Sequence, residues 1–328
     1  MILVTGAAGF IGSHVVEQLL RLGFKVAGID NFDPFYDKEI KWNNLSNALK
    51  EERFSFWEGD ITDVNFLDHL PFFPSAIIHL AAKAGVQPSL KDPKGYMDAN
   101  VQGTLNLLEW MRKRGCSKLI FASSSSVYGN NQVPFSEEDN DIYPLSPYAQ
   151  TKRSGELMNY TYHHLYNFDI INLRFFTVFG PRQRPDLAIH KFTDRIVHDQ
   201  PIDVYGKGNT MRDYTFIGDI VQGVINAYYY LVAHRDIFEI INLGNRAPVS
   251  LAELIETLED TIGKKAIRNY MPEQPGDMKV TCASVDKASR LLSYTPKTTL
   301  KEGIRIFYDW YRNQQNENEQ IKYRCTYL

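Results

Sequence analysis

A tyrosine and a lysine four residues apart, Tyr148 and Lys152, are the pair of side chains best suited to moving a proton. Residues at positions i and i+4 lie on one face of a helix, so the ammonium would sit beside the phenol. A nearby positive charge lowers the pKa of a tyrosine from about 10, which would make Tyr148 a general acid and base. Taken alone, such a pair is more often an ordinary helix surface.

Three glycines, Gly6, Gly9 and Gly12, follow the first apolar run, and Phe10 and Ile11 begin a helical pattern between them. Glycines at a strand–helix turn let the backbone approach a pyrophosphate at the helix N-terminus, where free N–H groups attract anions. The spacing is GxxGxxG rather than the GxGxxG of the dinucleotide fingerprint, and such a turn favours glycine in any case.

An acidic residue strengthens this interpretation. Asp30 ends the next apolar run, 18 residues after Gly12, and is followed by Asn31 and Phe32 rather than by an arginine. A carboxylate there suits an unmodified adenosine ribose and repels a 2′-phosphate. The sequence therefore predicts a dinucleotide site that prefers NAD to NADP.

Serines occupy residues 123–126, after a further apolar run and before Tyr148. By themselves they are explained as the polar end of a strand. The order of glycine loop, serines, tyrosine and lysine is much harder to explain without a shared site.

The elements that must position these residues alternate along the first half of the chain. Strands are expected at 1–5, 25–29, 54–58, 76–80, 118–122 and 169–175, and helices near 11–22, 38–50, 63–70, 94–114 and 147–167. Short apolar strands alternating with helices predict an α/β fold with a doubly wound parallel sheet. Ser146 and Pro147 supply an N-cap and a first-position proline for the last of these helices.

After about residue 175 the chain becomes rich in Pro, Gly and Arg. Helices are expected near 187–199, 219–233, 251–262, 285–293 and 300–313, and strands near 202–205 and 238–243. We expect residues 1–175 to form one domain, to which 216–245 returns. Residues 176–215 and 246–313 should form a smaller second domain, and 314–328 a polar, frayed tail.

Composition limits the classes of partner. The 328 residues carry 36 Lys+Arg against 39 Asp+Glu, a net charge of −3, which argues against nucleic acid or a charged membrane surface. Three scattered cysteines predict neither a disulfide framework nor a metal site. With no apolar stretch of membrane-spanning length and no N-terminal leader, a cytoplasmic protein is expected.

At this point the sequence resembles the extended short-chain dehydrogenases/reductases, specifically the nucleotide-sugar 4-epimerases. The resemblance runs from residue 1 to about 312. It is carried by the glycine loop from Thr5 to Gly12, by Gly59-Asp60-Ile61, His79-Leu80-Ala81-Ala82, Asn100, Ser124, Tyr148 with Lys152, Arg174-Phe175-Phe176, Arg212-Asp213-Tyr214 and Pro275-Gly276-Asp277.

The resemblance implies a Rossmann-type domain that holds NAD and a smaller C-terminal α/β domain that holds a nucleotide diphosphate sugar. In the family, the residues matching Asp60 and Ile61 flank the adenine and that matching Lys83 contacts a cofactor ribose. The cofactor-binding residues it implies are Gly6, Gly9, Phe10, Ile11, Gly12, Asp30, Asn31, Phe32, Asp60, Ile61, Leu80, Ala81, Ala82, Lys83, Asn100, Tyr148, Lys152 and Phe175.

Departures within the family indicate the substrate. Related dehydratases carry an Asp-Glu pair after the catalytic Ser/Thr and decarboxylases a Glu, whereas this chain has Ser125 and Ser126. Thr177 stands where galactose epimerases have an asparagine, and the stretch 180–186 and Gln274 are similar to those of UDP-glucuronate 4-epimerases. Gln87 departs in the other direction, because related epimerases commonly have an arginine there.

Arg184 is expected to bind the sugar carboxylate through a bidentate pair. The alternatives are that it contacts the pyrophosphate or lies at the surface. The substrate-binding residues expected are Ser124, Ser125, Ser126, Tyr148, Thr177, Arg184, Arg212 and Asp277, of which the residue matching Arg212 grips the pyrophosphate in the family.

The expected activity is reversible C4 epimerisation of UDP-glucuronate to UDP-galacturonate, in which Ser124, Tyr148 and Lys152 are catalytic. UDP-glucose or UDP-N-acetylglucosamine is the close alternative substrate. A UDP-glucuronate decarboxylase and a non-catalytic NAD-binding regulator are less favoured, since regulators on this fold commonly lose the tyrosine or lysine.

A homodimer is expected from apolar residues beyond one sheet-facing stripe on two helices, because the family pairs there through a four-helix bundle. The residues are Leu105, Leu108, Trp110, Met111, Leu157, Met158, Tyr162 and Leu165. Simple core packing is the alternative.

Overall fold

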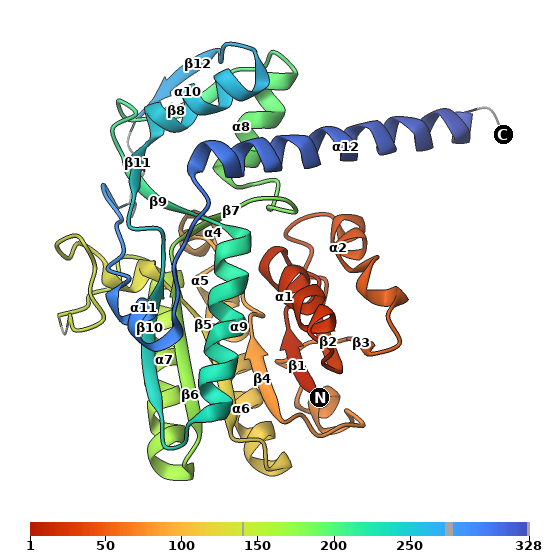
Figure 1. The fold of residues 1–328 in the computed structure, drawn as a ribbon, viewed down its shortest axis with the longest axis vertical. Coiled ribbons are helices and arrows are strands. Elements are labelled where there is room, and N and C mark those ends of the chain that lie inside the picture. Colours follow the sequence, from red (N-terminus) through yellow and green to blue (C-terminus); the bar gives the residue numbers. More distant parts are fainter. Residues whose placement is uncertain (140, 273–277, 327–328) are drawn as a thin grey trace.

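The structure is a computed structural model that describes residues 1–139, 141–272 and 278–326, with side chains described as far as residue 315 (Figure 1). Seven parallel strands form the central sheet in the order β10-β6-β5-β4-β1-β2-β3. They are β1 (Ile2–Thr5), β2 (Val26–Asp30), β3 (Phe54–Glu58), β4 (Ala76–His79), β5 (Lys118–Ser124), β6 (Asp169–Phe175) and β10 (Phe238–Leu243). The six expected strands are confirmed, and β10 returns to pair with β6.

Helices cover both faces of this sheet, which is the doubly wound arrangement (Figure 1). On one face, α1 (Phe10–Arg21) and α9 (Ile217–Ala233) pack on a core that includes Ile2 and Val4. On the other, α6 (Gly103–Arg114) and α7 (Pro147–Tyr166) pack on a core that includes Leu3. Strand β1 is buried along its whole length, and its first three residues are apolar, because successive side chains enter opposite cores.

Shorter elements connect the strands around this sheet. They are α2 (Lys38–Leu45), η1 (Ala48–Lys50), α3 (Val64–Asp68), α4 (Val86–Lys91), α5 (Pro93–Met97), the π-helical η2 (Asp98–Gln102) and η3 (Ser125–Tyr128). The predicted start of α7 is confirmed, because the Ser146 side chain accepts a hydrogen bond from Ala149 N at 3.2 Å and Pro147 is the first helical residue.

A second set of elements lies beyond the carboxyl ends of the central strands (Figure 1). Strands β7 (Thr177–Phe179), β9 (Met211–Phe216) and β11 (Pro248–Ser250) form one small sheet, and β8 (Ile202–Tyr205) pairs with β12 (Arg268–Met271). The helices of this set are α8 (Ala188–Val197), α10 (Leu251–Ile262) and α12 (Leu300–Thr326), whereas α11 (Asp286–Leu292) packs beside β10 and shares the core of the central sheet with α9. A separate apolar core joins α8, α10 and the start of α12 through Phe192, Leu254 and Phe307.

The helix expected near 300–313 extends further than predicted, since α12 continues to Thr326. The stretch from Asn313 to Gln320 contains neither proline nor glycine, so nothing in it ends a helix. None of the described helices combines the length and apolarity needed to span a bilayer.

The apolar residues expected at a dimer interface are mostly core residues. Leu108, Trp110, Met111 and Tyr162 are buried within the single chain. Leu105 and Met158 are partly buried against the same core. Only Leu157 and Leu165 are well exposed, at 55% and 58%. Helical periodicity identifies an apolar face but not whether the sheet or another chain covers it.

Candidate functional site

A cavity of about 660 Å³ opens where the central strands end. Its wall is formed by the residues that follow β1, β2, β3 and β4 and by the carboxyl ends of β5 and β6. Since the strand order reverses between β1 and β4, this is the crevice in which doubly wound folds bind ligands.

Most of the residues predicted for the site line this cavity. They are Gly6, Gly9, Phe10, Ile11, Gly12, Asp30, Asn31, Asp60, Ile61, Leu80, Ala81, Ala82, Lys83, Ser124, Tyr148, Lys152, Phe175, Thr177, Arg184 and Arg212. The structure does not bring Phe32, Asn100, Ser125 or Ser126 to its wall. Asp277 and Gln274 lie outside the described residues.

Two positions of the glycine loop, Gly6 and Gly12, accept no residue other than glycine. Gly6 has φ +70°, and a Cβ there would lie 2.8 Å from Ala81 N. A Cβ on Gly12 would lie 2.0 Å from Gly6 O. Gly9 is the N-cap of α1 and has no side chain to accept a hydrogen bond from the first N–H groups of the helix. These residues line the cavity, so their N–H groups are available to a ligand there. This backbone cradle fits a dinucleotide pyrophosphate.

The carboxylate at the end of β2 is held by the backbone. Asp30 accepts hydrogen bonds from Ala8 N at 3.0 Å and Phe32 N at 2.9 Å. The pKa of Asp30 lies above its usual value because burial raises it more than these hydrogen bonds and the nearby Lys41 lower it. Phe32 itself packs against Trp42, with ring centroids 4.5 Å apart, which explains why it turns away from the cavity wall.

Asp60 and Asn31 form the part of the cavity wall next to Asp30. Asp60 accepts hydrogen bonds from the Thr62 and Asn31 side chains at 2.7 Å each. Burial raises the pKa of Asp60, but the hydrogen bonds from Thr62 and Asn31 outweigh it, so the pKa is lowered. A carboxylate with this low pKa stays ionised at neutral pH.

Asn100 does not line the cavity but forms hydrogen bonds with a residue that does, Lys83. It accepts from Lys83 N at 2.8 Å and donates to Lys83 O at 2.9 Å, and it also donates to Thr151 Oγ1 on α7 at 3.0 Å. The Lys83 ammonium is itself 3.1 Å from Asp92 and 3.8 Å from Asp33. Asn100 therefore fixes the position of the Lys83 backbone relative to the helix that carries Tyr148.

Tyr148, Ser124 and Lys152 meet in the middle of the cavity wall. All three side chains line the cavity, and Lys152 Nζ donates to Ala122 O at 2.8 Å. Burial lowers the pKa of Lys152 to about 7. Tyr148 and Lys152 are thus two titratable groups of one cavity wall, each able to exchange a proton.

The expectation that Lys152 lowers the pKa of Tyr148 is corrected by the structure. Burial raises the Tyr148 pKa, and the groups that oppose this rise are the Ser124 hydroxyl and the Arg184 guanidinium. Lys152 contributes little because burial disfavours its own charge and its ammonium is bonded to a backbone oxygen.

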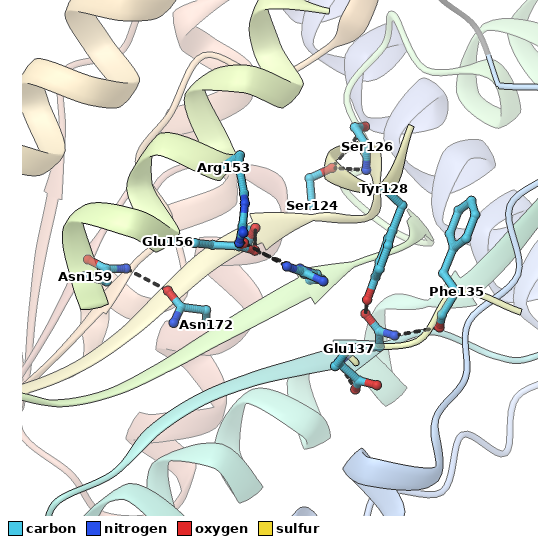
Figure 2. A network of polar contacts seen from close by, with 12 residues as sticks. Ser124, Ser126, Tyr128, Phe135, Glu137, Arg153, Glu156, Asn159 and Asn172 are labelled. Atoms are coloured by element: carbon cyan, nitrogen blue, oxygen red, sulfur yellow. Dashed lines mark hydrogen bonds and ion pairs between the residues drawn. The ribbon is translucent and has the colours of Figure 1, made fainter. Parts of the chain in front are cut away.

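A buried polar network supports the strand that carries Ser124 (Figure 2). Ser123 donates to Glu156 Oε1 at 2.6 Å, and Arg174 donates to both Glu156 oxygens at 2.8 and 2.9 Å. Ser124 in turn donates to Ser126 Oγ at 3.1 Å. Glu156 thus ties α7, β5 and β6 together, and Ser126 orients Ser124 rather than facing the cavity.

The other end of the cavity carries Thr177, Arg184 and Arg212. The Arg184 side chain is only 16% exposed, so it does not lie at the surface. Its guanidinium is stacked 5.1 Å from the Phe35 ring and pairs with Asp186. Arg184 and Tyr148 line the same cavity, and the charge of Arg184 opposes the rise of the Tyr148 pKa.

Several wall residues were not anticipated from the sequence, among them Tyr36, Lys41, Gln183, Asp186 and Tyr214. Tyr36 and Lys41 follow Asp30 closely, so the rule that ligands bind beyond strand ends would have pointed to them. Gln183 and Asp186 flank Arg184 in the chain. Tyr214 belongs to the motif Arg212-Asp213-Tyr214, in which only Arg212 had been given a site role.

Comparisons with known proteins agree with this geometry. The GDP-mannose 4,6 dehydratase family model matches residues 3–307. A UDP-glucuronate 4-epimerase of Thermodesulfobacterium geofontis is 44% identical over 323 residues, which cover 98% of each chain. This chain belongs to the extended short-chain dehydrogenases/reductases, in the branch of the nucleotide-sugar 4-epimerases.

Solved structures of this epimerase branch share the fold. The UDP-glucuronic acid 4-epimerase of Bacillus cereus, in complex with UDP-glucuronic acid and NAD, superimposes with a TM-score of 0.89 at 38% identity and covers 95% of this chain and 99% of its own. The UDP-glucose 4-epimerase of Thermotoga maritima, with UDP-glucose, gives a TM-score of 0.87 at 30% identity, covering 96% and 99%. The Rossmann-type fold predicted from the sequence is confirmed.

Proposed function

We propose that this protein catalyses the reversible epimerisation of UDP-glucuronate to UDP-galacturonate at C4, using bound NAD. The observation that carries the proposal is that Arg184, with a side chain only 16% exposed, lines the same cavity as Tyr148 and Ser124. The carboxylate of glucuronate hangs from C5, next to the carbon that reacts. A cation that binds it must therefore lie beside the group that moves the C4 hydroxyl proton.

The residues of the glycine loop fit NAD, since Gly6 and Gly12 leave room for a backbone cradle that any Cβ would fill. Residues from Gly6 to Gly12 would hold the pyrophosphate, Asp30 the adenosine ribose, and Asp60 and Ile61 the adenine. NAD when bound supplies a reversible hydride acceptor, so the overall reaction involves no net oxidation.

The protein's own residues then handle the proton and the charge. Tyr148 accepts the proton of the 4-hydroxyl and later returns it. Ser124 donates to the oxygen on which charge develops, and the Ser126 backbone N–H, which donates to Ser124 Oγ at 3.1 Å, holds Ser124 in place. Lys152, with a pKa near 7, exchanges protons with its surroundings near neutral pH and orients the cofactor ribose.

We place the nucleotide sugar against residues 176–215 and 246–313, with Arg212 on its pyrophosphate and Thr177 with Arg184 on the sugar carboxylate. Thr177 and Arg212 are already in the cavity wall. Ser125 and Ser126 follow Ser124 where a carboxylate base would be needed for dehydration or decarboxylation, so neither reaction is supported.

A panel of UDP-sugars followed by NMR tests this proposal. UDP-glucuronate should give UDP-galacturonate as the product, with the 4-epimer ratio approached from both directions. Conversion of UDP-glucose or UDP-N-acetylglucosamine in preference to the acid sugar would favour the alternative substrates. Release of a UDP-pentose would identify a decarboxylase, and no turnover of any sugar would support a regulator.

The purified protein should contain NAD and very little NADP. The Asp30 carboxylate, held by Ala8 and Phe32 N–H groups, accepts hydrogen bonds from ribose hydroxyls and repels a 2′-phosphate. Nucleotides released by denaturing the protein and separated by chromatography provide the measurement. Equal amounts of the two cofactors would contradict the role given to Asp30.

We also propose a homodimer, in the cytoplasm, formed through α6 and α7. Leu157 and Leu165 lie eight residues apart on α7 and are more than half exposed. Light scattering at micromolar concentration should give twice the mass of one chain, and Leu157→Asp with Leu165→Asp should give a monomer. A monomeric wild-type protein would reject this assembly.

A further inference from the structure

Asp186 lies two residues after Arg184 on the same loop and lines the same cavity. Its carboxylate accepts two hydrogen bonds from one edge of the guanidinium, from Nε to Oδ1 at 2.9 Å and from Nη2 to Oδ2 at 2.8 Å. This is the parallel, bidentate geometry in which an arginine binds a carboxylate most strongly. An arginine proposed to hold a substrate carboxylate thus already holds one from its own chain.

Counting the guanidinium donors shows that both carboxylates can be accommodated. Asp186 takes the edge formed by Nε and Nη2, and the other Nη2 hydrogen contacts Ala84 O at 3.3 Å. The second edge, formed by Nη1 and Nη2, is therefore engaged only through this long contact. A sugar carboxylate could bind that edge while Asp186 stays in place.

The surroundings of Arg184 favour one fixed orientation of the guanidinium. The Phe35 ring lies 5.1 Å from its central carbon, and the side chain is 16% exposed. A flexible arginine loses rotamer freedom when it binds a ligand, and contacts made beforehand remove that loss. Asp186 supplies the strongest of these contacts.

We propose that Asp186 is a positioning and specificity residue that presents the Nη1–Nη2 edge of Arg184 to the carboxylate of an acidic sugar. This inference rests on the proposed function. The pair with Asp186 also keeps the buried guanidinium charge balanced before the substrate arrives. Asp186 touches neither the reacting carbon nor the proton-transfer group, so it acts through Arg184.

The test is the affinity of the purified, NAD-containing protein for UDP-glucuronate, UDP-glucose and UDP, measured by titration calorimetry. Asp186→Asn removes the negative charge and one of the two acceptor oxygens at nearly constant side-chain size. Asp186→Ala removes both hydrogen bonds to Arg184. Each should raise the Kd for UDP-glucuronate about tenfold, the size expected for a charge-assisted hydrogen bond. The Kd for UDP-glucose and UDP should change less than about twofold, because neither carries a carboxylate.

Asp199→Asn is the matched control, since it breaks a 2.8 Å ion pair with Lys264 that lies outside the cavity wall. It should alter none of the three affinities. Unchanged UDP-glucuronate affinity in both Asp186 variants would overturn the proposal. So would tighter binding, which would mean that Asp186 competes with the sugar carboxylate, or an equal loss for all three ligands. Failure of the wild-type protein to form UDP-galacturonate would count against the proposed function instead.

Discussion

Tyr148→Phe should lower kcat for UDP-glucuronate epimerisation by roughly 10³-fold, within the range contributed by a positioned acid–base group. The variant loses only the hydroxyl of a ring that lines the cavity together with Ser124. Without it, the proton of the 4-hydroxyl has no acceptor at the point where the carbonyl forms. Bound NAD and the Kd for UDP should stay close to wild type, because the ring and its surroundings are unchanged.

Initial rates by NMR and cofactor content by absorbance provide the readouts for this variant. Tyr160→Phe is a suitable control, since Tyr160 lies on the same helix and is 55% exposed. It should leave kcat unaltered. If Tyr148→Phe retains wild-type turnover, Tyr148 is not the acid–base group. Retention of the biological activity by this variant would support a non-catalytic regulator.

Arg184→Ala should reduce kcat/KM for UDP-glucuronate by roughly 10²-fold, the order expected when one partner of a buried charge pair is removed. Oxidation of glucuronate at C4 produces a β-keto acid. Such acids lose CO₂ when the breaking C–C bond lies parallel to the carbonyl π system. A guanidinium that holds the carboxylate away from this alignment protects the intermediate while the ring turns over.

Loss of this anchor therefore has a second expected result. Arg184→Ala should release some decarboxylated 4-keto-pentose and leave reduced cofactor on the protein, visible as growth of the NADH absorbance band. Thr177→Val, which removes a hydroxyl from the same cavity wall, should show the same effects to a smaller degree. Turnover of UDP-glucose, where present, should change much less. Wild-type kinetics on the acid sugar in both variants would remove the main physical support for glucuronate.

Local sequence was sufficient for the scaffold of this protein. Apolar runs such as Ile2–Thr5 are buried on both faces of the sheet, and a continuous run of this kind specifies a parallel strand wherever it lies. Gly6 and Gly12 occupy positions where a Cβ would collide with the backbone, so their role follows from residue type. Ser146 and Pro147 start α7 through contacts within a single turn.

The tertiary structure alone decided the pKa shifts, the burial of apolar helix residues and the partners of Arg184, because each of these depends on the surroundings of the side chain. The i, i+4 spacing placed Lys152 near Tyr148, but the direction of the Tyr148 pKa follows from burial, which every neighbouring element contributes to. Trp110 and Met111 are apolar residues on a helix whose sequence does not say whether the sheet or a second chain covers them, and the sheet does. The pairing of Arg184 with Asp186, Ala84 O and Phe35 brings together segments about 100 and 150 residues apart in the chain. Spacing and residue type act over one or two turns of chain, whereas desolvation and charge pairing are set by whatever the fold brings within a few ångströms.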